Sequence, residues 1–347
     1  MKITSKMIHR DIRLAGFFLK IFLKFKSKKS FVRMGRLMFL ADRFAKVKGI
    51  QLSEQIISTI VNQNLKLCVY KPLNPKPDAI GLLWIHGGGY AIGSPKQDHA
   101  YIQNFINAAN CIVVSPYYRL SPEAPYPAAV NDCYHALLWM KEHAADLGIR
   151  SDQLFVAGNS AGGGLSAAVT LMARDRKEVN IAFQMPFYPM IDDRMITPSS
   201  RDNNAPVWNS TANTIAWELY LGSLYCTDKV PVYAAPARET DFSGLPPAYS
   251  FVGDIEPFYD ETRQYIQNLQ NAGVNAELDI YPGCFHAFDH FCSGSKIGRT
   301  SREKYLEKFR YASTHYFAAQ RNLSVPVKSN IAFSNSRSPR FVFSVTL

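Results

Sequence analysis

The sequence predicts an α/β protein whose mainly parallel sheet is flanked by helices on both faces. From about residue 65, short continuous apolar runs recur along the chain, and helical stretches separate them. Runs that are apolar at every position are typical of strands buried on both faces of a parallel sheet. Their alternation with helices indicates a doubly wound arrangement. Two glycine-rich turns directly follow such runs and mark where two of the strands end.

The predicted elements follow one another along the chain. The expected strands are 65–70, 81–85, 111–114, 154–157, 248–252 and 276–281. The expected helices between them are 101–109, 128–147, 161–174 and 259–271, and a final helix covers 301–320. The first of these strands is identified by its alternating pattern, which ends at Pro72, rather than by a continuous apolar run.

The first 58 or so residues predict helices and no strand. Apolar side chains recur there at helical spacing, as at Phe17, Phe18 and Ile21. The apolar stretch 14–23 is interrupted by Lys20, and no small-residue cleavage site follows it. It is too short and too charged to span a bilayer, and an amphipathic helix is the better interpretation.

Positive charge is concentrated in the same segment. The chain has a net charge of +11, yet residues 1–48 contain only two acids, Asp11 and Asp42. The main interpretation is a solvated basic lid or arm, and the alternative is a weak peripheral contact with a membrane surface. The middle of the chain has mixed charge, so no nucleic-acid partner is expected. Cations of the basic segment include Lys24, Lys26, Lys28, Lys29, Arg33 and Arg36.

Composition limits the class of protein. Hydrophobic residues make up 47% of the 347 residues, which supports a sizeable core and excludes disorder of the chain as a whole. None of the six cysteines forms a C-x-x-C pair, and a chain of this length needs no disulfide scaffold. Cys68 and Cys111 lie in strand-like runs, where a free thiol acts as a small apolar group. Reduced cysteines and a cytoplasmic location are therefore expected.

Residues 192–233 interrupt the rhythm of strands and helices. They hold prolines, paired asparagines and two apolar pieces centred on Trp208 and Trp217. This segment is interpreted as an insertion over the edge of the sheet. After the final helix, residues 321–347 show no clear helical period and are expected to form a poorly ordered tail.

The pentapeptide 158–162, Gly-Asn-Ser-Ala-Gly, follows the strand 154–157 and opens a predicted helix. A sharp turn crowds the backbone around Ser160, so only small residues are tolerated beside it. The start of the helix offers free N–H groups and a positive dipole to a developing anion. This strand–turn–helix context predicts that Ser160 is a nucleophile. The alternative is an ordinary Asn-Ser turn between strand and helix.

A second motif, His86-Gly87-Gly88-Gly89, follows the strand 81–85. A glycine triplet lets backbone N–H groups point inward without side chains in the way, and two such donors can hold the oxyanion of a tetrahedral intermediate. A flexible loop and a phosphate-binding loop are the alternatives. No Gly-Lys-Ser/Thr follows, which excludes a Walker loop.

A serine nucleophile needs a base, and His286 is the candidate. It follows the strand 276–281, and it comes after both the nucleophile and the candidate acids. The alternative is a surface histidine. His286 and His290 are four residues apart, as in a metal pair, but no third ligand is evident in the sequence. No metal or organic cofactor is therefore expected.

The orienting acid lies after the strand 248–252, where Asp254, Glu256 and Asp260 compete. Each follows a strand end, from which a carboxylate could reach an imidazole. Two of the three must be solvated loop acids or helix caps. Spacing alone does not choose between them.

With these motifs the sequence resembles the hormone-sensitive-lipase-like branch of the α/β-hydrolases, which includes bacterial acetyl esterases. The resemblance covers about residues 65–320. It includes 118–127, Tyr-Arg-Leu-Ser-Pro-Glu-Ala-Pro-Tyr-Pro, which matches a signature of the family. It also includes the histidine loop 281–288, Tyr-Pro-Gly-Cys-Phe-His-Ala-Phe.

The resemblance implies an α/β-hydrolase fold over residues 61–320, with a helical cap built from residues 1–60 and the insertion. It also implies that the backbone amides of Gly88, Gly89 and Ala161 form the oxyanion hole. The expected domain plan is therefore an N-terminal cap segment, a catalytic domain that carries a cap insertion, and the tail.

The resemblance also bears on the acid. The family usually has an aspartate directly before a Pro-Leu or Pro-Phe pair, and this chain has Glu256 before Pro257 and Phe258. Glu256 is therefore chosen, although its side chain is one methylene longer, and Asp254 is held in reserve. Triads with glutamate occur in this fold.

The implied function is a serine carboxylesterase that hydrolyses small-molecule esters with short acyl groups through Ser160, His286 and Glu256. One alternative is an amidase or a carbohydrate deacetylase on the same triad. A second is a non-catalytic binding protein of the same fold, although such proteins lose the histidine that this chain keeps. A third is an enzyme that docks on lipid surfaces through its N-terminus. The sequence predicts no oligomeric state.

Overall fold

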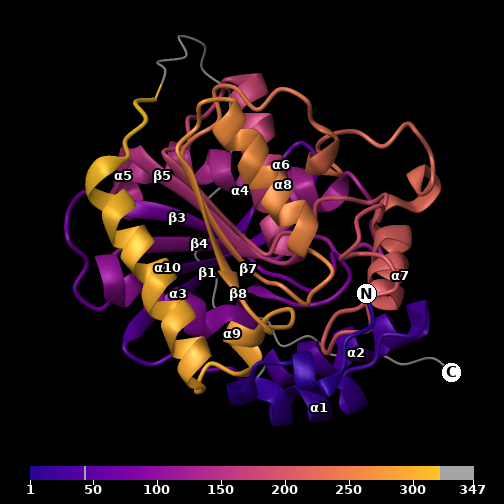
Figure 1. Ribbon diagram of the computed structural model, residues 1–347. Coiled ribbons are helices and arrows are strands. Elements are labelled where there is room, and N and C mark those ends of the chain that lie inside the picture. The colour runs from indigo at the N-terminus through magenta and orange to yellow at the C-terminus, as the bar shows by residue number, and fades with distance from the viewer. Residues whose placement is uncertain (43, 321–347) are drawn as a thin grey trace, which may run out of the picture.

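One sheet of eight strands runs through the protein, as seen in the computed structural model, which describes residues 1–42 and 44–320 (Figure 1). The strand order is β1-β2-β4-β3-β5-β6-β7-β8. The first two pairs in this order are antiparallel, and the remaining pairs are parallel. The strands are β1 (Ile50–Ile57), β2 (Leu65–Pro72), β3 (Ala79–Ile85), β4 (Ile112–Pro116), β5 (Ile149–Asn159), β6 (Phe183–Phe187), β7 (Ala248–Gly253) and β8 (Ala276–Tyr281).

Helices flank the sheet and close one end of it. The α-helices are α1 (Arg13–Phe22), α2 (Lys28–Asp42), α3 (His99–Ala109), α4 (Ala128–Glu142), α5 (Ala144–Leu147), α6 (Ala161–Arg176), α7 (Ser210–Leu221), α8 (Tyr259–Asn271), α9 (Phe288–Phe291) and α10 (Lys296–His315). Short 3₁₀ turns cover Ser5–Met7, Arg10–Ile12, Pro95–Asp98, Gly222–Leu224 and Pro236–Arg238.

Alternate side chains of each central strand enter the two halves of the core, because successive residues of a strand point to opposite faces. Leu83 and Ile85 of β3 pack in the same cluster as side chains of α4 and α6. Leu82 and Trp84 pack in the cluster that holds side chains of α3 and α10. This three-layer packing confirms the doubly wound class that the sequence predicts.

The six predicted strands correspond to β2, β3, β4, β5, β7 and β8, but the expectation of no strand before residue 58 is wrong. β1 lies at the edge of the sheet and pairs along its whole length with β2. Most of its side chains are exposed. An edge strand with one partner buries little apolar surface, so its sequence carries only a weak pattern.

Two further differences concern the centre and the end of the chain. The sequence analysis missed β6, in which the fourth of five residues is a proline, Pro186, a residue that argues against a strand inside a sheet. The last helix begins at Lys296, five residues earlier than predicted, and ends at His315. The predicted tail, 321–347, lies outside the described residues. None of the helices within the described part of the chain combines the length and apolar character needed to cross a bilayer.

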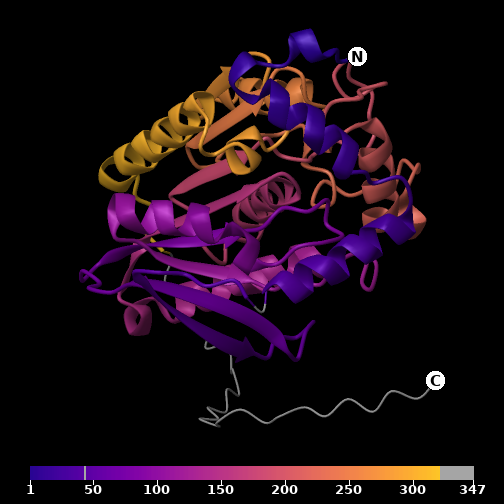
Figure 2. The same cartoon turned by 90° about the horizontal axis from the view of Figure 1, so that it is seen from below.

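Two segments far apart in the sequence lie together over one end of the sheet. Helices α1 and α2 lie on the lower side of the molecule in Figure 1, and Figure 2 shows that side from below. Helix α2 contacts α7 of the 192–233 segment, and Lys28 pairs with Glu218 across them at 2.6 Å. Gly16 of α1 lies against the ring of Phe285, where an added Cβ would approach to 2.9 Å.

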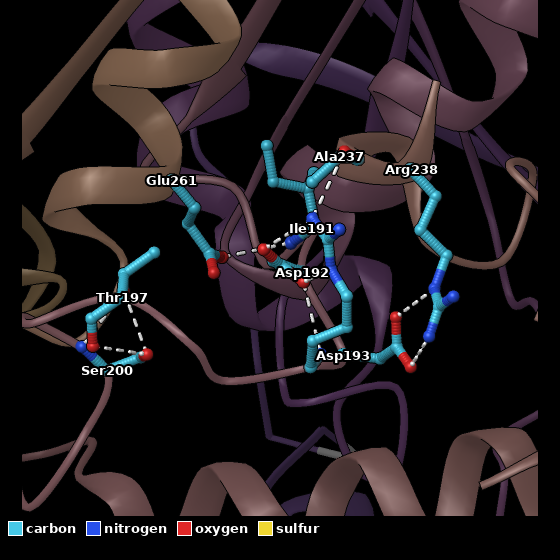
Figure 3. A network of polar contacts seen from close by, with 9 residues as sticks. Ile191, Asp192, Asp193, Thr197, Ser200, Ala237, Arg238 and Glu261 are labelled. Atoms are coloured by element: carbon cyan, nitrogen blue, oxygen red, sulfur yellow. Dashed lines mark hydrogen bonds and ion pairs between the residues drawn. The ribbon is translucent and has the colours of Figure 1, made fainter. Parts of the chain in front are cut away.

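A polar anchor ties the two ends of the 192–233 segment together (Figure 3). The buried carboxylate of Glu261 on α8 accepts a hydrogen bond from the backbone N–H of Ile191 at 3.0 Å. The N–H of Ala237 donates to the carbonyl of Ile191 at 3.1 Å. Arg238 forms two hydrogen bonds to Asp193, at 2.7 and 2.8 Å. The chain just after the segment is therefore held against the chain just before it.

Candidate active site

Ser160 occupies the sharp turn between β5 and α6. Its backbone has φ +57° and ψ −120°, a conformation that residues other than glycine rarely adopt. The two flanking glycines permit this turn because a Cβ at Gly158 or Gly162 would approach the carbonyl oxygen of Ile85 to 2.5 or 2.0 Å. The N–H of Ser160 donates to the carbonyl of Phe187 at 3.0 Å. The serine is thus held at the carboxyl end of the central strands.

A continuous chain of hydrogen bonds connects Ser160, His286 and Glu256. The Ser160 hydroxyl lies 2.8 Å from Nε2 of His286. On the other side of the ring, Nδ1 of His286 is hydrogen-bonded to Oε2 of Glu256. The second oxygen of Glu256 accepts from the N–H of Gly253 at 3.2 Å. A carboxylate at Nδ1 leaves Nε2 free to accept the serine proton.

The two other candidate acids lie elsewhere. Asp254 accepts a hydrogen bond from the N–H of Gly283 at 2.6 Å, in the loop that carries His286. Asp260 accepts from the N–H of Ser199 at 2.8 Å. Of the three carboxylates that the sequence left open, Glu256 is the one that the structure places on the imidazole.

The predicted oxyanion amides are available donors beside the serine turn. The backbones of Gly88 and Gly89 have φ +121° and +59°, which favours glycine at both positions. Within residues 1–42 and 44–320, the N–H groups of Gly88, Gly89 and Ala161 donate to no protein acceptor. Gly87 brings this loop against the serine turn, because a Cβ there would lie 3.3 Å from Cβ of Ser160. Backbone N–H groups without an acceptor are rare inside proteins, and these three could donate to an oxygen atom of a bound ligand.

His86, although it belongs to the same motif, supports the loop rather than acting as a base. Its Nδ1 is hydrogen-bonded to the carbonyl of Gly87 at 2.8 Å. Its ring stacks on Tyr118 with 4.2 Å between centroids, and the Tyr118 hydroxyl donates to the carbonyl of His86 at 2.9 Å. Burial lowers the pKa of His86 to about 4, so the ring is neutral at ordinary pH.

Aromatic rings enclose the reactive groups. Tyr188 and Phe258 meet the His286 ring edge to face, with centroids 4.9 and 5.0 Å away. Trp208 lies 6.2 Å from the same ring and also covers Gly89, where an added Cβ would approach it to 2.4 Å. Above Trp208 lie Phe25 and Phe31, with centroids 5.7 and 5.9 Å from it. Both Ser160 and His286 are buried beneath this roof.

A buried polar group that the sequence analysis missed lies directly behind the serine turn. Asp98 accepts hydrogen bonds from Nε1 of Trp84 at 2.9 Å and from the side-chain amide of Asn159 at 3.3 Å. Asn159 precedes Ser160, and its Oδ1 lies where a Cβ on Gly87 would approach to 2.5 Å. Burial raises the pKa of Asp98 to about 7. No sequence motif signals this residue, because its partners are far apart along the chain.

The fold and this arrangement define a hydrolase with a serine at a strand–helix turn. Residues 82–290 match the family described as the alpha/beta hydrolase fold, and the chain belongs to that family.

The family contains curated and structurally characterised relatives that resemble this chain. Carboxylesterase NlhH of Mycobacterium tuberculosis is 32% identical over 245 residues, which are 70% of this chain and 76% of that protein. A structure named bacterial heroin esterase superimposes with a TM-score of 0.81 at 31% identity, over 90% of this chain and 99% of that one. Esterase LipW from Mycobacterium marinum superimposes with a TM-score of 0.81 at 28% identity, over 89% and 97% of the two chains.

Proposed function

We propose that this protein is a serine carboxylesterase. Ser160 is the nucleophile, His286 the general base and acid, and Glu256 the group that orients the imidazole. The observation that carries the proposal is the unbroken hydrogen-bond chain from the Ser160 hydroxyl through both nitrogens of His286 to a buried carboxylate. The named activities of the relatives, carboxylesterase and esterase, support the same reaction.

The reaction begins when the hydroxyl of Ser160 attacks the ester carbonyl and passes its proton to Nε2 of His286. The imidazolium that forms is stabilised by Glu256, whose carboxylate faces Nδ1. Negative charge on the carbonyl oxygen is held by the N–H groups of Gly88, Gly89 and Ala161. His286 then gives its proton to the leaving alkoxide, and water reverses the sequence on the acyl-enzyme.

Short acyl groups are the preferred substrates in this proposal. The support is the aromatic roof: Trp208 lies directly over Gly89, and the reactive serine is buried beneath it. A bulky acyl chain would need to displace these rings, whereas an acetyl or butyryl group displaces less.

A chain-length series of p-nitrophenyl esters tests the proposal, with the Ser160→Ala variant as the blank. We expect kcat/KM to be highest for the short esters, and we expect Ser160→Ala to lose several orders of magnitude in kcat. Unchanged ester hydrolysis by Ser160→Ala would refute the role of the serine. The matching p-nitroanilides address the amidase alternative, since an amide hydrolysed as fast as the ester would contradict an esterase.

A further inference from the structure

Helix α1 presents an apolar face that the rest of the described chain does not cover. Five of its side chains, Leu14, Phe17, Phe18, Ile21 and Phe22, are between 42% and 77% exposed. At 3.6 residues per turn they fall within an arc of about 140° on the outer side of the helix. A monomeric soluble protein rarely leaves such a cluster of large apolar side chains in water unless the cluster binds something.

Helix α2 continues this surface and adds positive charge. Val32, Leu37 and Leu40 are between 39% and 55% exposed. At the same helical spacing, exposed cations lie between them on the outer side of α2. Both helices lie on the lower side of the molecule in Figure 1 and are seen together in Figure 2. We call these exposed apolar and cationic side chains the cap-helix face. Its cations are Lys24, Lys26, Lys29, Arg33 and Arg36.

The charge of the cap-helix face indicates the chemistry of its partner. Within residues 1–42 and 44–320, none of these five cations lies within ion-pair distance of an acidic side chain. Only two acids, Asp11 and Asp42, occur in residues 1–48. A second copy of this chain would bring like charges together if the face bound to itself. An anionic partner is therefore favoured over self-association.

A cavity beside the face has the same charge. It has a volume of about 340 Å³ and opens between the end of α1 and the start of α7. Lys20, Lys24 and Lys26 form part of its wall together with Lys2, and Asp202 is its acid within the described chain. A pocket of this size and charge suits a phosphate-bearing headgroup.

We propose that the cap-helix face docks on an anionic phospholipid surface. Exposed phenylalanine and leucine side chains enter the boundary between headgroups and acyl chains, and the surrounding lysines and arginines contact lipid phosphates. Neither half of this interaction involves Ser160 or His286. A test of docking can therefore fail without affecting the proposed ester hydrolysis, and the reverse also holds.

Docking places the roof of the active site next to the lipid. The link between α1 and α2 carries Phe25, which stacks on Phe31 with 4.5 Å between centroids. Both rings pack on Trp208, which lies over His286. An ester that is dissolved in the bilayer would therefore meet the cap before it meets water.

Co-sedimentation of the full-length protein with vesicles tests the docking. One vesicle is phosphatidylcholine alone, and the other is phosphatidylcholine mixed with phosphatidylglycerol. We expect the protein to sediment with the anionic vesicles, to remain in solution with the zwitterionic ones, and to be released by salt. Absence of sedimentation with the anionic vesicles at low salt would overturn the proposal.

Two sets of variants locate the contact on the protein. The pair Phe18→Ser with Phe22→Ser should lower the partition coefficient at least tenfold, because two aromatic side chains no longer enter the lipid. The set Lys29→Glu, Arg33→Glu and Arg36→Glu should lower the partition coefficient by about a hundredfold or more, because three attractive charges become repulsive. Both sets should keep the Tm and the rate with a water-soluble ester, since these side chains are exposed.

Matched controls change the same residue types elsewhere. Ile56→Ser with Ile60→Ser removes apolar side chains that are 70% and 92% exposed, in the edge strand β1 and in the turn that follows it. The set Lys76→Glu, Lys177→Glu and Arg310→Glu reverses three exposed charges, which lie after β2, after α6 and in the second half of α10. Binding within twofold of the wild type supports the cap-helix face. Equal losses in the control sets, or a dimer that the α1 pair converts to a monomer without any vesicle binding, would overturn the proposal.

Discussion

Glu256 and Asp254 show how two neighbouring carboxylates take different roles. The longer side chain of Glu256 lets one oxygen reach the imidazole while the other accepts from Gly253 at the end of β7. Asp254 is turned to the loop that carries His286 and accepts from the N–H of Gly283. In the proposed mechanism, Glu256 fixes the tautomer of His286 and stabilises its imidazolium form, whereas Asp254 holds the backbone of the histidine loop.

Replacing each carboxylate by its amide separates these roles. Glu256→Gln should lower kcat by about a thousandfold or more, because an amide favours the wrong tautomer and does not stabilise the imidazolium. Asp254→Asn keeps an oxygen that accepts from Gly283, so its kcat should stay within about tenfold of the wild type. Steady-state kinetics with a p-nitrophenyl ester measure both. A large loss in Asp254→Asn beside a small one in Glu256→Gln would reverse the assignment.

At the scale of elements, the roof over the site depends on contacts between two segments. Trp208 belongs to the 192–233 segment. Of the two rings that pack on it, Phe25 lies in the link between α1 and α2, and Phe31 lies in the first turns of α2. The anchor at Glu261 and Arg238 fixes where that segment begins and ends. Hydrogen bonds and an ion pair therefore fix the two ends of the segment that carries Trp208. The contact of Trp208 with the N-terminal helices depends on packing of aromatic rings.

Removing the ring of Trp208 should widen the acyl space. We expect Trp208→Ala to raise kcat/KM for octanoate relative to acetate by about tenfold, because a longer chain can occupy the vacated volume. Trp139→Ala, on α4, is the matched control, and it should leave the ratio unchanged. Chain-length kinetics measure the effect, and a ratio that does not change in Trp208→Ala would contradict a roof that limits chain length.

Local motifs made several elements predictable and left others hidden. The strands before Gly87 and Ser160 were found because each one ends at a glycine-rich turn whose sterics are local. β1 was missed because an edge strand needs little apolar pattern. β6 was missed because its proline, Pro186, is typical of a strand end rather than of a central strand. The environment of Asp98 could not be predicted from the sequence, because it is assembled from β3, β5 and the turn before α3.

At the scale of the whole molecule, buried acids on one side of the sheet link stability to pH. Burial raises the pKa of Asp98 to about 7 and that of Asp289 to about 6. Hydrogen bonds from Trp84 and Asn159 to Asp98 offset only part of the effect of burial. Between about pH 4 and pH 7 the folded protein therefore holds protons that the unfolded chain has released.

Stability should consequently fall as pH rises through this window and level off above it. From the raised pKa of Asp98 alone, we expect the free energy of unfolding to drop by about 3 kcal/mol between pH 5 and pH 8. The side chain of the Asp98→Asn variant cannot ionise, so the free energy of unfolding of this variant should decrease less, by that amount, over the same pH range. Urea unfolding at the two pH values measures both proteins. An equal decrease in the wild type and in Asp98→Asn would show that this carboxyl does not titrate as the structure indicates.

The shared roof has a consequence for how substrate range can change. Phe31 and Trp208 touch each other but are encoded far apart, so two distant stretches of the gene specify the roof that we propose limits the acyl chain. Random libraries confined to one stretch will leave the opposite half of that wall as it was. Recombination between homologous genes, which exchanges the stretches independently, will instead sample new pairings and so new preferences.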